Sequence, residues 1–365
     1  RLQHHIMCLV SNMSKELCYA HADKFYYQSA DQSYENYRRL FVKNLESKPY
    51  QGIIALSGSE METDVIFGPL MKDCQPWCEA NNKKFYVMTP SQLHNCKYPN
   101  EEYPHVEWIE FHGYDMYLYG DTRLEESKIP LPLQNPTKLF VCYNNRRDVH
   151  RDMLLDKLKE HNMLDKGTVT YRLSGNPEYK ALSDEDNFKL SERKEWECCH
   201  FPQSYFGGFV DIVTESRYLP GEHYLSEKTF KPILGLKPFL VLSAQGYHTW
   251  LERKGIKKYN IFDYSFDNEP KLEDRVEGII QNLKRLDALY KTPEDYANVL
   301  KELEPDMQHN LDAYTNNIKN GQFLLNPILD YLKQYHFPIP NELLAKDIRH
   351  DVQMYYEFLH TVIVR

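Results

Sequence analysis

The sequence lacks the glycine-rich patterns by which common nucleotide-binding folds cradle phosphates. Its 365 residues include only 15 glycines. They form neither G-x-G-x-x-G nor G-x-x-x-x-G-K-[ST], which argues against a dinucleotide-dependent oxidoreductase and a P-loop enzyme. A nucleophile-elbow motif is also missing, so a serine-hydrolase triad has no support. A nucleotide would have to be held in another way.

Long apolar runs are missing as well. No stretch reaches the roughly eighteen apolar residues that span a bilayer, and no signal-peptide pattern is present. Acidic residues outnumber basic ones, 53 against 44, and the net charge of −9 argues against a protein that coats nucleic acid. The eight cysteines show no repeating framework, which in a long chain fits reduced thiols. We expect a cytoplasmic protein without a membrane span.

Apolar runs and helical periodicity alternate along the chain, which predicts an α/β fold with parallel sheets. In the first part, strands are predicted at 4–10, 52–56, 84–89 and 106–111 and an amphipathic helix at 31–46. In the second part, strands are predicted at 138–143, 209–214, 238–242 and 259–262 and helices at 149–164, 246–254 and 271–289. Further helices are predicted up to the C-terminus, interrupted by Pro305, Pro327, Pro338 and Pro340.

The length is too great for one ordinary core and suits two domains. We predict an N-terminal α/β domain at 1–130 and a proline-punctuated linker at 131–137. A second α/β domain is predicted at 138–335, and a C-terminal helix at 336–365 that packs back on the first domain.

The stretch 209–242 reads as a strand, a polar loop, a helix and a second strand, which is a βαβ unit. Ser226 suits the N-cap of the helix and Gly235 its end. Glu227 and Lys228 then fall in the first turn, where backbone N–H groups attract anions. Pro232 fits poorly inside such a helix, so the helix either is kinked or begins a turn later. An alternative interpretation makes the Glu-Lys pair a solvated helix start.

A second strand-to-helix turn lies at 138–164. Its helix is predicted to bury Val149, Met153, Leu154, Leu158 and Met163. Arg147 and Arg151 flank the start of this helix, and a planar guanidinium can span two phosphate oxygens. An exposed arginine without a ligand is the alternative.

One spaced pattern consists of Glu215, Ser216, the run from Tyr224 to Lys228 and the following Lys237 to Val241. This pattern resembles the donor-binding signature of the α1,3-fucosyltransferase family. The resemblance implies that Lys228 contacts the donor diphosphate, Glu227 its hydroxyl groups, and Tyr224 the nucleotide. Glu215 matches the acidic residue of the family's FEN element, whereas Ser216 replaces its Asn. Arg151 matches an arginine that reaches the diphosphate, with Arg147 able to assist.

This resemblance covers residues 138–245 and implies the GT-B arrangement of two facing Rossmann-like domains. The implied activity is transfer of a sugar from a GDP- or UDP-linked donor to a hydroxyl acceptor, expected to be a glycan. Positive charge at the diphosphate would stabilise the departing nucleotide, so no metal or other cofactor is obligatory. An Asp184-Glu185-Asp186 run has the D-x-D pattern of metal-dependent glycosyltransferases, but its polar surroundings are typical of a solvated loop.

An inverting transfer needs a general base, and a retaining one does not. The family carries a Glu after a strand that resembles 84–88, but here Thr89 and Pro90 follow. The base candidates are therefore the carboxylates Glu60, Glu62 and Asp64, which follow a predicted buried strand, with Glu110 and His112 behind them.

Two alternative functions remain. One is a glycosyltransferase that acts on a modified base in DNA, which predicts inhibition by salt. The other is a non-catalytic module that binds a sugar nucleotide or a glycan. Cys74, Cys78, His94 and Cys96 could be read as zinc ligands, but the first spacing is helical and the second pair lies in a loop-like stretch, which argues against a metal site.

Overall fold

The structure is a computed structural model that describes residues 17–21, 33–47, 52–56, 68–89, 101–110, 135–144, 147–171, 187–189, 200–221 and 223–319. The chain divides into two compact units, one formed by Arg1–Asp121 with Ile318–Arg365 and the other by Thr122–Asn317. The described helices include none that is both long enough and apolar enough to cross a membrane. The predicted strand at 4–10 and the predicted helix at 336–365 lie outside the described residues.

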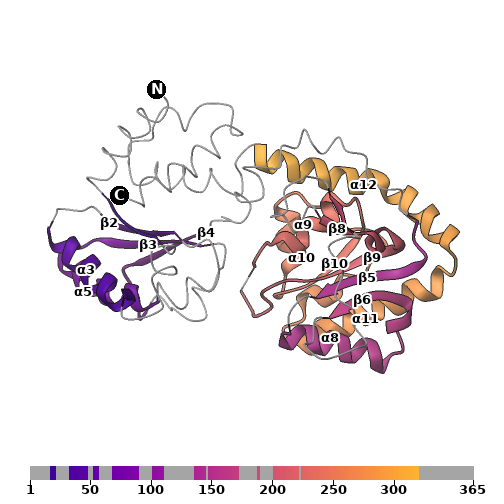
Figure 1. Cartoon of the computed structure of the whole chain (residues 1–365), viewed down its shortest axis with the longest axis horizontal. Helices are drawn as coiled ribbons and strands as arrows, with labels where there is room; N and C mark the ends of the chain where they lie inside the picture. The colour runs from indigo at the N-terminus through magenta and orange to yellow at the C-terminus, as the bar shows by residue number, and fades with distance from the viewer. Residues whose placement is uncertain are drawn as a thin grey trace. The chain divides into compact units, whose positions relative to one another are not determined.

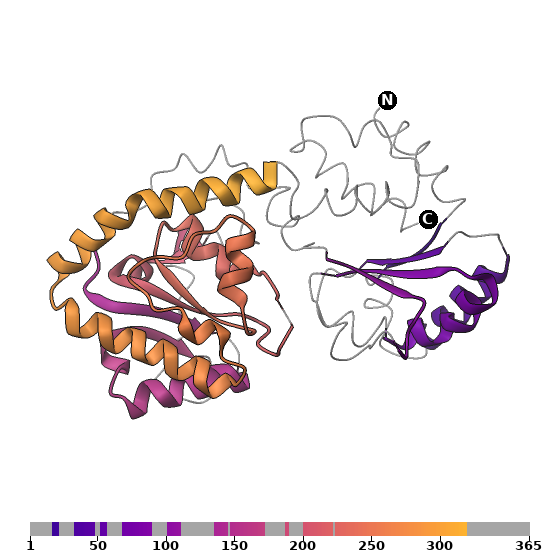
Figure 2. The ribbon, with the colours of Figure 1, turned by 180° about the vertical axis from the view of Figure 1, so that it is seen from behind.

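The first unit contains a parallel four-stranded sheet. Its strands follow the order of the chain, β1-β2-β3-β4. The strands are β1 (Leu17–His21), β2 (Gly52–Leu56), β3 (Lys84–Thr89) and β4 (Val106–Glu110), and the helices are α3 (Ser33–Ser47) and α5 (Gly68–Asn81). Both helices lie on the same side of the sheet (Figures 1 and 2), as right-handed crossovers between strands in sequential order require. The predicted α/β character is confirmed here.

The core of the first unit lies between this sheet and the two helices. Phe41 and Leu45 of α3 pack with Leu70 of α5 and with Ile53 and Phe85 of the sheet. Two residues of the apolar face predicted for 31–46, Phe41 and Leu45, therefore face the core. Apolar burial of this kind contributes about 25 cal/mol for each Å² removed from water.

The second unit is built on another parallel sheet, of order β10-β9-β5-β6. Its strands are β5 (Lys138–Asn144), β6 (Gly167–Tyr171), β9 (Gly208–Thr214) and β10 (Phe239–Leu242). Its α-helices are α8 (Val149–Glu160), α9 (Glu227–Leu234), α10 (Tyr247–Arg253), α11 (Leu272–Leu289) and α12 (Pro293–Lys319), with short 3₁₀ turns η3 (Leu164–Lys166), η6 (Gln203–Gly207) and η7 (Ser265–Asn268). A small antiparallel pair joins β7 (Asn187–Lys189) to β8 (His200–Pro202).

Helices cover both faces of this second sheet. α8 and α11 lie against one face and α9 lies on the other (Figures 1 and 2). β9 and β10 are buried along their whole length, as expected for parallel strands covered on both faces.

The order of the strands reverses between β5 and β9. From β5 the chain passes through α8 to β6 on one side, and later returns to β9 on the other side before continuing to β10. Such a reversal is a topological switch point, and in open α/β sheets ligands bind outside the carboxyl ends of the strands at this point. The carboxyl ends of β5 and β9 are Asn144 and Thr214.

Several sequence predictions for the second unit need correction. α8 ends at Glu160 rather than 164, because Asn162 has a left-handed backbone with φ of 53° and Asn is one of the few residues that adopt this conformation readily. Val149, predicted as buried, is 57 % exposed at the first helical position. His150 and Arg151 are buried in its place.

Two other predictions are wrong. The predicted strand at 259–262 is a turn whose N–H groups are satisfied locally: the N–H of Tyr259 donates to the hydroxyl of Tyr264 at 3.1 Å, and that of Phe262 to the carbonyl of Tyr259 at 3.2 Å. Pro305 does not interrupt its helix, since α12 runs through it from Pro293 to Lys319.

Candidate functional site

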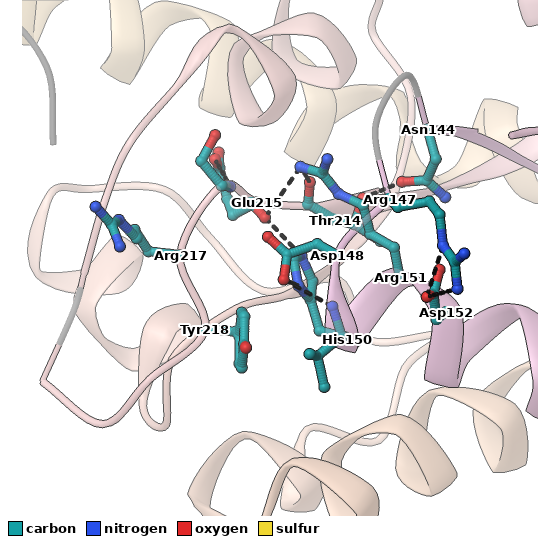
Figure 3. Close-up of polar contacts among 12 residues, drawn as sticks. Asn144, Arg147, Asp148, His150, Arg151, Asp152, Thr214, Glu215, Arg217 and Tyr218 are labelled. Atoms are coloured by element: carbon teal, nitrogen blue, oxygen red, sulfur yellow. Dashed lines mark hydrogen bonds and ion pairs between the residues drawn. The ribbon is translucent and has the colours of Figure 1, made fainter. Parts of the chain in front are cut away.

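The candidate site lies at the switch point, where β5 and β9 end side by side (Figure 3). The hydroxyl of Thr214 donates to Oδ1 of Asn144, which joins the last residues of the two strands. Both side chains are buried. Polar side chains buried at a strand end and bonded to each other fix the spacing of the two backbones.

α8 begins directly after β5. Asp148 is its N-cap, and Oδ1 of Asp148 accepts a hydrogen bond of 2.7 Å from the N–H of Val149. Arg147 is largely exposed and donates from Nη2 to Oδ2 of Asp152 at 2.8 Å, and this contact raises the pKa of Arg147. The predicted donor contact of Arg147 therefore competes with an ion pair on the surface of α8.

Arg151 turns inward from the first turn of α8. Its side chain is 6 % exposed, and Nη2 lies 3.5 Å from the carbonyl oxygens of both Thr214 and Glu215. The guanidinium therefore sits at the carboxyl end of β9 although it comes from the helix that follows β5 (Figure 3). This is the edge at which the sequence predicts a phosphate-binding arginine.

Glu215 is a buried centre of hydrogen bonds with no solvent exposure. Oε2 accepts from the hydroxyl of Ser226 at 2.6 Å and from the N–H of Ser216 at 3.0 Å. Oε1 accepts from the N–H of Ser226 at 3.2 Å and from the hydroxyl of Thr229 at 2.5 Å, with the hydroxyl of Tyr247 at 3.5 Å. The carboxylate thus holds the start of α9 against the end of β9. Direct contact between Glu215 and a donor stays a prediction.

The start of α9 confirms the predicted cap. Ser226 is the N-cap, and its hydroxyl accepts from the N–H of Lys228 at 3.2 Å. Gly235 is the C-cap, and Pro232 lies inside the helix, which begins at Glu227 and not one turn later. Nζ of Lys228 is 3.2 Å from the hydroxyl of Ser216. This ammonium group therefore also meets the segment that follows β9.

Of the other two predicted residues of this motif, the structure describes the side chain of Tyr224. Tyr224 is 4 % exposed, and its carbonyl accepts from the hydroxyl of Tyr247 at 3.0 Å. Glu227 begins α9, but its side chain lies outside the described residues. Contacts of Tyr224 with a nucleotide and of Glu227 with a sugar stay predictions.

The buried Arg275 of α11 anchors the loop that follows Glu215. The guanidinium donates to the carbonyls of Tyr218 at 2.8 Å and Ser243 at 3.1 Å, and also to those of Glu269 and Pro270. The hydroxyl of Ser243 donates to the carbonyl of Arg217 at 2.8 Å. The loop is thereby fixed to the end of β10 and to α11, so its geometry is set before any ligand arrives.

The base candidates Glu60, Glu62 and Asp64 lie outside the described residues, as do the Asp184-Glu185-Asp186 run, His94 and Cys96. Cys74 and Cys78 are buried in the core of the first unit, and burial raises the pKa of Cys78 to about 12. A thiol of this kind packs as a small apolar side chain. Within the described part of the chain, no three His, Cys, Asp or Glu side chains are grouped so as to hold a metal ion.

Three residues of the site were not predicted from the sequence: His150, Thr214 and Tyr247. His150 is buried beside Arg151, and its Nε2 lies 2.7 Å from the carbonyl of Glu215. The signal in the sequence was weak. Two of these residues are polar positions at the end of a strand or the start of a helix, and only the strand order shows that they meet.

Comparison of the chain with models of known protein families, with curated proteins and with solved structures gives no match. The resemblance to the α1,3-fucosyltransferases thus stays a prediction from short motifs. The geometry of the site carries the functional argument.

Two positively charged side chains lie at the carboxyl end of β9. Arg151 contacts the carbonyl of Glu215, and Lys228 contacts the hydroxyl of the next residue, Ser216. The first turns of α8 and α9 start at the same edge, because α8 follows β5 and the start of α9 is bonded to Glu215. Helix starts and cations together favour anions, phosphates in particular.

Proposed function

We propose that the second unit binds a nucleotide-diphosphate sugar and that the protein is a glycosyltransferase. The supporting observation is that Arg151 contacts Glu215 and Lys228 contacts the next residue, Ser216. These contacts lie beside two helix starts and at a topological switch point. Two cations from different helices suit a diphosphate, which carries charge on both phosphoryl groups. In this proposal the donor is GDP- or UDP-linked, and the acceptor is a glycan hydroxyl.

In the proposed reaction, the role of Arg151 and Lys228 is electrostatic. When the bond from sugar to diphosphate breaks, negative charge grows on the departing nucleotide, and fixed cations that are already in position stabilise it. The Arg151 guanidinium stays charged at all accessible pH values. The site has this charge without a metal ion, so the proposal requires no cofactor.

The GT-B arrangement is part of the same proposal. In it the acceptor enters from the first unit, and Glu60, Glu62 or Asp64 supplies the base if the transfer inverts configuration. In this proposal the protein acts in the cytoplasm. The proposal for the donor site depends only on residues of the second unit.

The first test is binding. The melting temperature of the full chain is measured with GDP, UDP, dTDP and CMP, with and without divalent metal, because a ligand that binds the folded state raises its stability. We expect one diphosphate to raise it without metal. If none does, the donor-site assignment is wrong.

Variants of Arg151 and Lys228 test whether these two residues bind the diphosphate. Arg151→Lys keeps a charge but loses the planar fork, and Lys228→Met removes a charge from a half-buried side chain. Each should weaken binding of the diphosphate at least tenfold. Lys301→Met, on the exposed side of α12, is the control and should bind as the wild type does. Equal binding by all four proteins would remove Arg151 and Lys228 from the site.

Turnover separates an enzyme from a binding module. The sugar nucleotide whose diphosphate binds is incubated with the full chain and a panel of glycan acceptors, and release of the diphosphate is followed. Release that depends on acceptor supports a transferase. Binding without any release supports the alternative of a non-catalytic sugar-nucleotide module.

A further inference from the structure

His150 is the second residue of α8 and has no solvent exposure. Its Nε2 lies 2.7 Å from the carbonyl oxygen of Glu215. A carbonyl oxygen only accepts hydrogen bonds, so Nε2 carries the proton. This bond joins the helix that follows β5 to the first residue after β9, across the switch point (Figure 3).

The imidazole is also held by an aromatic contact. The ring stacks on Tyr218, with 4.5 Å between ring centroids and an angle of 30° between the planes. Nδ1, which carries no proton in this tautomer, lies 3.5 Å from Oδ1 of Asp148 and makes no hydrogen bond with it. Burial, followed by the charge of Arg151, lowers the pKa of His150 to about 4, so the ring is neutral at pH 7. A neutral ring donates to the carbonyl of Glu215 without adding a second positive charge next to Arg151.

His150 and Arg151 meet the same carbonyl group. The bond from Nε2 of His150 to the oxygen of Glu215 is short, whereas Nη2 of Arg151 stands 3.5 Å from that oxygen, at the outer limit of a hydrogen bond. At this carbonyl the histidine therefore makes the stronger bond between α8 and the end of β9. Phosphate oxygens could replace the two long contacts of Arg151 at little cost, because 3.5 Å is the outer limit of a hydrogen bond.

We propose that His150 is a positioning residue for the donor diphosphate: its neutral imidazole holds the carboxyl end of β9 against α8 and so sets where Arg151 presents its guanidinium. The inference rests on the proposed function. Preorganised charge acts only when its position is fixed, and a shift of about 1 Å is enough to lose a large part of its effect.

Two substitutions at position 150 separate the hydrogen bond from the ring. His150→Gln places an amide N–H where Nε2 stood and can donate to the carbonyl of Glu215. His150→Phe keeps the stacking on Tyr218 and loses the donor. Tyr218→Leu removes the stacking partner from a half-buried position, and it serves as a third variant should the phenylalanine variant not fold.

The measurement is calorimetric affinity of the full chain for GDP and UDP and for guanosine and uridine. A positioning role predicts that the phenylalanine variant loses about tenfold in affinity for the diphosphate that the wild type prefers, with its nucleoside affinity unchanged. His150→Gln should stay within about threefold of the wild type for both ligands. Tyr218→Leu should lose about threefold for the diphosphate alone.

Two outcomes overturn the inference. If the folded phenylalanine variant, or Tyr218→Leu in its place, binds the diphosphate as the wild type does, His150 positions nothing. If diphosphate and nucleoside affinities fall equally, the role of His150 is structural only. Failure of the wild type to bind either diphosphate is a different result, since it removes the proposed function itself.

Discussion

Oε2 of Glu215 accepts a hydrogen bond of 2.6 Å from the hydroxyl of Ser226, which lies eleven residues later in the chain. This bond and the others to the same carboxylate close the loop between β9 and α9. The acidic residue of the motif thus builds the site by fixing the helix start on which Lys228 stands.

Glu215→Gln is expected to destabilise the second unit strongly. Both oxygens of the carboxylate accept hydrogen bonds. In glutamine an NH₂ group replaces one oxygen and would face a donor such as the hydroxyl of Ser226 or that of Thr229. Buried donors left without an acceptor cost about 3 kcal/mol in total. Denaturant unfolding gives this value directly. Glu252→Gln is the control, because Glu252 forms a half-exposed ion pair with Lys258 and should lose at most about 1 kcal/mol.

A smaller loss in Glu215→Gln than in its control would contradict the structural role given to this carboxylate. A stable Glu215→Gln protein that no longer binds nucleotide would instead favour a direct contact between the carboxylate and the donor. The two measurements together decide between the role that the resemblance implies and the role that the hydrogen bonds indicate.

Much of the second unit follows from the sequence. The β-branched run 209–214, the cap at Ser226 and the stop at Gly235 fix β9 and α9, because each signal is local. The partners of Glu215 do not follow in the same way. That Ser226 and Thr229 donate to it, and that the hydroxyl of Tyr247 lies 3.5 Å from it, depends on how α9 and α10 dock at the end of β9, which no local pattern encodes.

The errors have the same origin. The run 259–262 has the composition of a strand, yet its backbone donors are taken by a nearby hydroxyl and carbonyl, and tertiary context overrides propensity. Val149 satisfied the helical period but stands at the first position of α8, where His150 and Arg151 turn toward the sheet edge instead. Periodicity alone gave no reason to expect a buried histidine and arginine there.

Acid should destabilise the second unit through His248. The N–H of Val241 donates to Nε2 of this buried histidine at 3.0 Å, so Nε2 must be unprotonated and the ring neutral. Burial lowers the pKa of His248 to about 4. Because the pKa in the folded protein lies below that of the unfolded chain, about 6.5, this contribution is fully present above pH 6.5 and is lost as the pH falls toward 4.

The measurement is the free energy of unfolding of the wild type and of His248→Gln at pH 7.5 and pH 4.5. Glutamine does not titrate, and its carbonyl can accept from Val241. We expect the wild type to lose roughly 2–3 kcal/mol more than the variant between the two pH values. Asp211 and His150 also titrate in the folded protein, but they are present in both proteins and cancel in the difference. Equal losses would show that His248 is protonated with little cost.

Gly278 of α11 marks a close approach of two elements. A Cβ atom at this position would overlap the Cβ of Phe266 in η7 and stand 3.0 Å from its Cγ. Gly278→Ala gains up to about 1 kcal/mol of helix propensity, but the overlap with a buried side chain should cost about 1–3 kcal/mol. Thermal unfolding is therefore expected to show a net loss of stability, with Gln281→Ala on the exposed side of α11 unchanged or slightly more stable. A more stable Gly278→Ala protein would mean that η7 can move away.

Asp211 and Lys237 are two buried charged residues of the second unit that influence each other electrostatically. Nζ of Lys237 donates to the carbonyl of Gly208 and lies 4.8 Å from the ring centroid of Tyr205. Burial raises the pKa of Asp211 to about 6, against the effect of Tyr205 and then of Lys237. Burial likewise lowers the pKa of Lys237 to about 7, against the attraction of Asp211. Each group therefore helps to keep the other charged.

A double-mutant cycle measures this coupling. Removing one member leaves a buried charge without its partner, so Asp211→Asn and Lys237→Met should each cost about 3–5 kcal/mol in the free energy of unfolding. The double variant should cost clearly less than the sum, by about 1 kcal/mol or more, because it leaves no buried charge behind. Denaturant unfolding at pH 7 gives all four values. Losses that add to within about 0.5 kcal/mol would show that the two groups act independently.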